Sequence, residues 1–100
     1  MPPLLELLDR EERWTQGVYA TDALGYTVDL RSAAACRWCL SGGLLHCYTN
    51  DASYLAAERK LIEAFRRLHP DYMLGLAAWQ DKKGRTLAEI RQLLEEAATV

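Results

Sequence analysis

The most constraining feature of the sequence is an amphipathic pattern that predicts one long helix from Ala52 to Leu68. Charged residues occupy one side of this segment, and the helix ends before Pro70, because the residue that precedes a proline is driven out of the α region. A stripe of apolar residues must be buried against other elements, so we expect the remaining segments to pack around it. The stripe consists of Tyr54, Ala57, Leu61, Phe65 and Leu68.

The length and composition of the chain predict one small domain over residues 1–100. A chain of 100 residues can bury one modest core, and an apolar share of 50% argues against disorder. No apolar run approaches the roughly 20 residues that span a bilayer. The first charge comes at Glu6, so we expect no signal peptide and a cytoplasmic location. The net charge of -2 disfavours direct binding of nucleic acid, because such proteins carry surplus Lys and Arg.

The first third of the chain predicts a helix followed by a short hairpin. The helix runs from Leu4 to about Trp14 and ends at Gly17. Two β-rich runs, 18–21 and 26–30, flank a turn at 22–25, and together they predict a two-stranded hairpin over 18–30. Such a hairpin is only marginally stable on its own, so it must pack against the helices.

A second helix is predicted from Ser32, as its N-cap, to about Cys47. Gly42 and Gly43 lie inside this segment, where each glycine costs about 1 kcal/mol relative to alanine. The expected reason is that another backbone approaches the helix closely. The alternative is that the helix ends at Ser41–Gly43, which also resembles a C-cap.

The remaining segments complete a mainly α fold. Asp51 or Ser53 is the expected cap of the long helix, and residues 71–80 form a short helix or a packed loop. Thr86 and Glu89 form a capping box for the last helix. The predicted class is mainly α with a small β-hairpin (α+β): about four helices around one core, with the hairpin between the first and second helices. The last helix presents Leu87, Ile90, Leu94 and Ala97 to that core.

Four soft ligands lie close together in the middle of the chain and could in principle hold zinc: Cys36, Cys39, His46 and Cys47. At least three of them would lie on one helix, whereas structural zinc sites usually draw ligand pairs from separate turns. The cysteines also share a helix face with Leu40 and Gly43, as small core residues do. We therefore expect no metal and no cofactor. A zinc-stabilised regulatory or structural helical domain is the alternative.

Catalysis by a thiol is a third hypothesis, and the pattern disfavours it. Cys36 lies inside the predicted helix, away from the N-terminus that would depress its pKa. His46 and Cys47 are adjacent on that helix and do not face each other. The sequence contains no phosphate-binding loop and no nucleophile elbow. We therefore expect a protein that is not an enzyme.

The three tryptophans lie at the ends of predicted elements. Trp14 and Trp79 are expected to anchor the core, with the indole N–H reaching a carbonyl. Trp38 lies about 200° around the predicted helix from Cys36, from the rotation per residue. Trp38 is therefore the candidate for an exposed hot spot in an interface.

Four short motifs stand in order along the chain: Trp14-x-x-Gly17, Asp22-x-x-Gly25, Cys36-Arg37-Trp38-Cys39-Leu40-x-Gly42, and Trp79-x-Asp81 with Gly84-Arg85-Thr86-x-x-Glu89. Together they resemble an uncharacterised small domain family found in bacteria, prophages and phages. Where the family pattern has asparagine, this chain has Gln80. The resemblance covers most of the chain and implies no catalytic residue, because the family has no established enzyme activity. We expect structural roles for Trp14, Gly17, Cys36, Cys39, Gly42, Gly43, Trp79, Thr86 and Glu89.

The chain is also similar to small phage-encoded anti-CRISPR proteins in its size, its lack of catalytic residues and its phage-associated motifs. This resemblance implies a non-enzymatic inhibitor that sits on a host surveillance complex, such as CRISPR effector subunits, and blocks DNA binding. Exposed acids would then compete for basic DNA-binding residues of the target. The candidate contacts are Asp9, Glu12, Asp22, Asp29, Asp51 and Asp71, together with Trp38.

Overall fold

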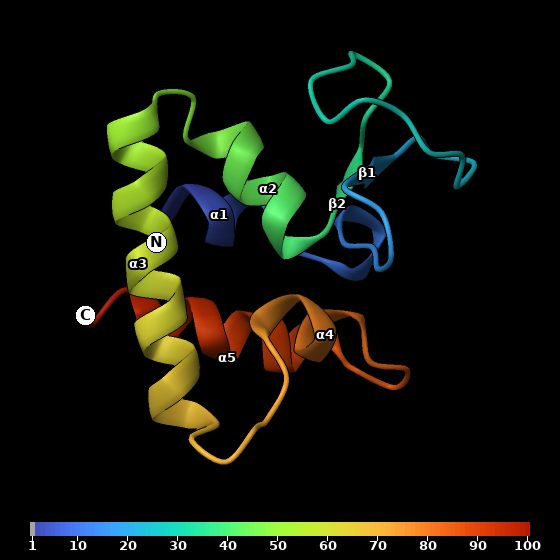
Figure 1. Cartoon of the computed structure of the whole chain (residues 1–100). Coiled ribbons are helices and arrows are strands. Elements are labelled where there is room, and N and C mark those ends of the chain that lie inside the picture. The colour runs from blue at the N-terminus through green and yellow to red at the C-terminus, as the bar shows by residue number, and fades with distance from the viewer. Residues whose placement is uncertain (1) are drawn as a thin grey trace.

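A computed structural model describes residues 2–100 and confirms a mainly α fold with a small antiparallel pair of strands between the first and second helices (Figure 1). None of the helices between Pro2 and Val100 is both long enough and apolar enough to cross a bilayer. In chain order the elements are α1 (Pro2–Leu7), the 3-10 turn η1 (Glu11–Arg13), β1 (Ala20–Thr21), β2 (Arg37–Trp38), α2 (Leu40–Cys47), α3 (Asp51–Leu68), α4 (Leu76–Asp81) and α5 (Leu87–Ala97).

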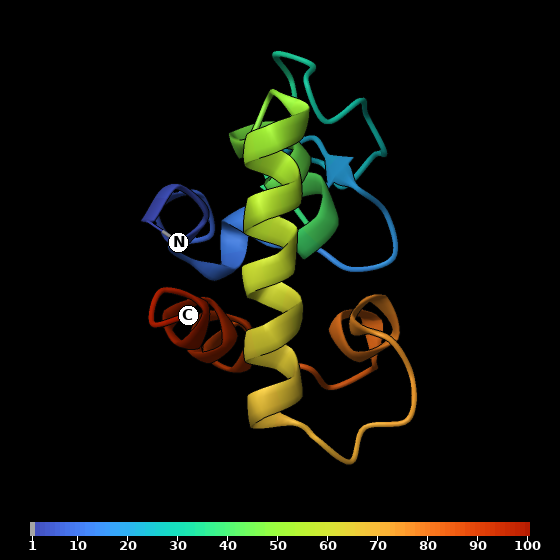
Figure 2. The same ribbon diagram turned by 60° about the vertical axis from the view of Figure 1, so that its left-hand side comes forward.

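The long helix α3 runs along one side of the fold and packs its apolar stripe against α5 and α2 (Figure 1). Its N-cap is Asn50, whose Oδ1 accepts a hydrogen bond from the Ser53 N–H at 2.9 Å, so the expected cap at Asp51 or Ser53 is wrong. Figure 2 shows α1 and α5 on one side of α3 and α4 on the other. The buried residues of α3 are Ala57, Leu61, Ala64 and Phe65.

The last helix, α5, packs against α3 and begins with the predicted capping box. Thr86 Oγ1 accepts from the Glu89 N–H, while the Glu89 carboxylate accepts from the Thr86 N–H at 3.1 Å. These bonds satisfy two N–H groups that have no partner within the helix. The core face predicted for this helix is confirmed, with Leu93 added: Leu87, Ile90, Leu93, Leu94 and Ala97 are all buried.

The first helix is shorter than predicted, because α1 ends at Leu7 instead of Trp14. The chain then extends at Arg10 before the turn η1, which brings the Trp14 ring into the core. Arg91 donates to the carbonyls of Leu5 and Leu8, both at 2.9 Å, so a side chain from α5 satisfies the end of α1. The free energy gained by burying the large indole exceeds the few tenths of a kcal/mol that each surface ion pair would add to a longer helix, so the helix ends early.

The antiparallel pair is formed by β1 and β2, and its second strand differs from the predicted one. Ala20 pairs with Trp38 and Thr21 with Arg37, whereas the segment 26–30 contributes only an isolated bridge from Thr27 to Thr21. The predicted turn at 22–25 is present, with the Gly25 N–H bonded to the Asp22 carbonyl. Trp38 of β2 pairs with β1 and is buried, so its expected role as an exposed hot spot is wrong.

The second helix begins at Leu40 with Cys39 as its N-cap, seven residues later than the predicted N-cap Ser32. The Ser32 hydroxyl accepts instead from the Ala34 N–H in a local turn. Cys36 lies outside the helix, because its N–H donates to the Thr21 carbonyl at 3.0 Å. The proposed shared face of Cys36, Leu40, Gly43 and Cys47 is therefore wrong for Cys36.

The two glycines lie inside α2, and the expected close approach explains both. A Cβ on Gly42 would overlap the backbone of Tyr19 at its carbonyl oxygen. A Cβ on Gly43 would come within 2.6 Å of Leu4 Cδ1. The helix can therefore lie directly against the β1 segment and α1 only if these positions carry no side chain.

We predict that Gly42→Ala lowers the free energy of unfolding by about 2 kcal/mol or more, because the backbone of Tyr19 cannot yield as a side chain can. Gly43→Ala should cost less than about 1 kcal/mol, since the end of the Leu4 side chain can rotate away and alanine favours the helix. Urea denaturation of both variants measures the difference. Equal losses would contradict this account of the close approach.

Candidate functional site

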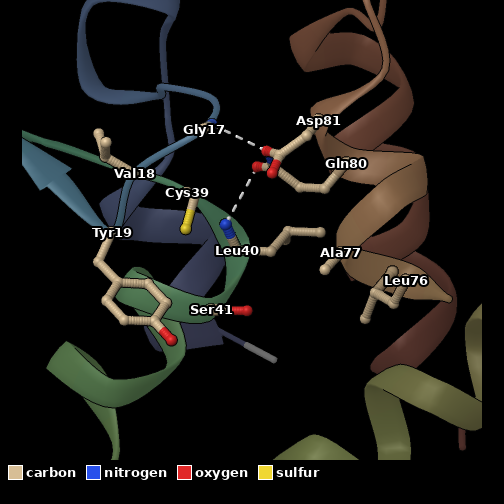
Figure 3. Close-up of a pocket in the computed structure, with 10 residues that line it drawn as sticks. All are labelled: Gly17, Val18, Tyr19, Cys39, Leu40, Ser41, Leu76, Ala77, Gln80 and Asp81. Atoms are coloured by element: carbon tan, nitrogen blue, oxygen red, sulfur yellow. Dashed lines mark hydrogen bonds between the residues drawn. The ribbon is translucent and has the colours of Figure 1, made fainter.

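A pocket of about 340 Å³ opens where the N-terminus of α2 faces α4, and we call it the α2–α4 pocket. Figure 3 shows the segment that leads into β1 on one side of it and α4 on the other, with the Cys39 sulfur and the Ser41 hydroxyl between them. Its volume falls within the range of small-ligand sites. The lining residues are Gly17, Val18, Tyr19, Cys39, Leu40, Ser41, Leu76, Ala77, Gln80 and Asp81.

The floor of the pocket is held in place by the side-chain amide of Gln80, which is only 3% exposed. Gln80 Oε1 accepts from the indole Nε1–H of Trp14 at 2.7 Å and from the backbone N–H of Leu40 at 3.1 Å. Gln80 Nε2 donates to Asp81 Oδ1 at 2.6 Å. A single amide therefore connects the N-terminal segment, α2 and α4.

The segment that follows Trp14 is attached to the end of α4 by further hydrogen bonds. Gln16 Nε2 donates to the carbonyls of Gln80 at 2.8 Å and Lys82 at 3.0 Å. The Gly17 N–H donates to Asp81 Oδ1 at 3.0 Å, and Gly17 has a φ of 82°, a left-handed conformation that suits glycine. These contacts fix the segment that leads into β1, which forms one wall of the pocket, relative to α4, which forms the other.

Sequence reasoning missed Gln16, Gln80 and Asp81 as site residues. The available signal was their position inside the two tryptophan motifs, within two residues of Trp14 or Trp79. The structural roles expected for both tryptophans are consistent with their burial, at 8% and 1% exposure. The Trp14 partner is a side-chain amide, whereas the Trp38 indole donates to a backbone carbonyl, that of Leu30.

The thiol in the pocket caps α2 and is not activated as a nucleophile. Cys39 Sγ accepts from the Gly42 N–H at 3.3 Å. Burial raises the pKa of Cys39 above its ordinary value, backbone N–H groups of Gly42 and Ser41 oppose this change, and the charge of Asp81 adds to it. Burial also raises the pKa of the Cys47 thiol. Both thiols therefore keep their protons at neutral pH, and a thiolate is what nucleophilic attack requires.

The two histidines lie away from the pocket thiol. His46 Nδ1 lies 3.2 Å from the Leu30 carbonyl oxygen, and its ring packs against Trp38 with centroids 4.8 Å apart. The His69 ring lies 5.0 Å from that of Trp79. Among residues 2–100, no group of three or more His, Cys, Asp or Glu side chains is placed to hold a metal ion. The zinc set suggested by the sequence is therefore not assembled.

The structure spreads the six candidate acids over the molecule instead of gathering them. Asp51 starts α3 and Asp71 follows its end, so these two lie at opposite ends of an 18-residue helix that is about 27 Å long. Asp22 Oδ1 accepts from the N–H groups of Leu24 and Tyr26 within its own turn. Asp29 likewise accepts from the Arg31 N–H, Asp9 pairs with Arg10, and Glu12 lies in η1.

A second depression, the α3–α4 hollow, has a volume of about 630 Å³ and carries the most exposed apolar side chains of this face. Met73 is 93% exposed and Leu74 is 63% exposed in the loop before α4. A smaller depression of about 140 Å³ shares Ser41 and Ala77 with the α2–α4 pocket, Ile62 with the hollow, and Leu76 with both. The three depressions therefore form one continuous surface over α2, α3 and α4.

Residues 4–100 match a family of unknown function, DUF6197. The chain belongs to this family. No curated protein and no solved structure matches the chain. The predicted membership of an uncharacterised small domain family is thereby confirmed. The DUF6197 match contains every residue of the α2–α4 pocket and of the α3–α4 hollow, so the whole surface lies within the domain that defines the family.

We predict that Gln80→Leu lowers the free energy of unfolding by about 2–4 kcal/mol, because it leaves two buried N–H donors without an acceptor. Gln92→Leu, at an exposed position of α5, is the matched control and should change stability by less than about 0.5 kcal/mol. Urea denaturation measures both, and the Trp14 indole N–H resonance should move only in the Gln80 variant. A stable Gln80→Leu protein would refute the role given to this amide.

We predict that stability falls as the pH rises above the ordinary Cys pKa of 9.0. The unfolded chain then loses the Cys39 proton while the native chain keeps it, so the native state binds more protons and a higher pH favours unfolding. Cys39→Ser removes this titration and keeps an N-cap oxygen, so part of the fall should disappear. Urea midpoints between about pH 7 and pH 10 test this, and identical slopes in both proteins would contradict it.

Proposed function

We propose that this DUF6197 chain is a non-enzymatic protein-binding inhibitor from a phage or mobile element, which docks a host complex on the continuous surface over α2, α3 and α4. In the specific form of the proposal, the target is a CRISPR effector in the host cytoplasm and the inhibitor blocks its DNA binding. The target and the origin rest on the sequence resemblance alone. The docking surface rests on the contacts described above.

The observation that carries the docking surface is the exposure of large apolar side chains around two joined depressions. Met73 and Leu74 line the α3–α4 hollow, and Tyr19, which is 58% exposed, lines the α2–α4 pocket. Exposed apolar groups that border a hollow are typical of interaction sites. Aromatic and methionine side chains are enriched in such interfaces.

The chemistry of the site supports binding over catalysis. The pocket thiol keeps its proton, and the hydrogen bonds of Gln80 occupy its carbonyl oxygen and engage its amide nitrogen. Among residues 2–100 no hydrogen bond joins either histidine to a cysteine, so a Cys–His pair is not formed. A pocket whose thiol keeps its proton and, within residues 2–100, has no histidine to activate it is better suited to recognition of a partner than to nucleophilic catalysis.

We predict that Ala77→Glu abolishes partner capture while Ala78→Glu retains it. Both alanines are exposed on α4, and only Ala77 lines the pocket, so the pair changes charge and size equally. The immobilised protein is exposed to a lysate of a CRISPR-bearing host, and effector subunits are identified and tested for DNA binding with equimolar inhibitor. Recovery of no effector subunit would refute the target, and equal capture by both variants would refute the surface.

A further inference from the structure

The carboxylate of Asp81 stands at the edge of the α2–α4 pocket in a fixed orientation. Its Oδ1 accepts from the Gly17 N–H and from Gln80 Nε2, which hold the group from two sides. Figure 3 shows the carboxylate extending from α4 across the pocket mouth toward Gly17. Two hydrogen bonds to one oxygen leave the other oxygen available to a ligand.

This carboxylate has no cationic partner within the part of the chain that the structure describes. The ion pairs of residues 2–100 involve Asp9, Glu63, Glu89 and Glu96, and none reaches Asp81. Lys82 and Lys83 follow Asp81 in sequence without approaching it to within 4 Å. The negative charge at the pocket mouth is therefore unpaired.

The other pocket walls suit the stem of a long basic side chain. Leu40, Leu76 and Ala77 provide apolar surface, and the hydroxyls of Tyr19 and Ser41 provide further oxygen acceptors. Lysine and arginine bury an aliphatic stem against apolar surface while the charged end meets polar groups. A carboxylate at the edge of this pocket lets such a side chain lay its stem across the apolar walls and place its charged end on the acid.

An anionic ligand is disfavoured at the same place, although a helix N-terminus lies there. The Leu40 N–H donates to Gln80, the Gly42 N–H to Cys39 Sγ, and the Gly43 N–H to the Cys39 carbonyl. Anion binding at a helix start depends on free N–H groups, and here three of them are engaged. The adjacent charge of Asp81 would also repel an anion.

We infer that the α2–α4 pocket receives a single lysine or arginine side chain of the partner protein, with its charged end on Asp81. The inference deepens the proposed function and rests on it for the identity of the partner. In this inference, the single oriented carboxylate of Asp81 takes the role that the sequence assigned to six acids, which the structure shows to be dispersed. Competition for a basic DNA-binding residue would then occur at one defined position.

The test is an NMR titration of the 100-residue chain with capped single amino acids. Acetyl-arginine-amide and acetyl-lysine-amide at millimolar concentration should shift the amide resonances of Gly17, Leu40, Ser41 and Ala77, whereas neutral acetyl-glutamine-amide should not. Asp81→Asn keeps an oxygen for Gly17 and removes the charge, so it should weaken binding by up to about fivefold, as expected for loss of one exposed ion pair. Comparing the two cationic probes identifies which side chain fits better.

The matched control is Asp71→Asn, which removes the charge of an exposed acid outside the pocket and should leave the titration unchanged. Pocket shifts that are equal for charged and neutral probes, shifts that persist undiminished in Asp81→Asn, or an absence of shifts would overturn the inference. If Ala77→Glu abolishes partner capture and any of these results is also obtained, only the inference about Asp81 is overturned and the docking surface is still supported. Pocket binding of the probes together with equal capture by the two alanine variants would instead overturn the proposed function.

Discussion

The side-chain amide of Gln80 is the contact on which the arrangement of this molecule depends. Trp14 lies 66 residues before it and Leu40 lies 40 residues before it, yet both donate to the same oxygen. A buried donor without an acceptor costs about 1–3 kcal/mol, so this oxygen holds three segments in one position. Its nitrogen also donates to Asp81, so the carboxamide serves as an acceptor on one side and as a donor on the other.

The close approach at Gly42 determines where the pocket lies. On one side, the backbone of Tyr19 lies against α2 so closely that a β-carbon has no room. On the other side, α4 is joined to α2 through Gln80 at its C-terminal end, while Leu76 and Ala77 near its start border an opening. Contact at one end and separation at the other produce a pocket with walls set by backbone and buried hydrogen bonds. Such a site is preorganised, so a partner loses little free energy in ordering it.

The chemical character of the surface follows from the same bonds. Burial keeps the Cys39 thiol protonated, and the bonds from Gly17 and Gln80 orient the Asp81 carboxylate without neutralising it. A neutral thiol and a fixed charge favour recognition over covalent chemistry. Exposed apolar side chains such as Met73 extend this surface beyond the pocket, and they provide area that a single carboxylate could not.

The sequence by itself determined the elements whose signals are local. The apolar stripe of α3 and the capping box at Thr86 depend on residues three or four positions apart, and both appear as predicted. Only the tertiary structure determined the conformation of the segment before α2 and the position of the pocket. Trp38 pairs with Ala20 instead of continuing a helix, because burying its ring against distant residues outweighs local propensity. The pocket likewise depends on Gln80 meeting residues far away in the chain, and such contacts leave no periodic pattern in the sequence.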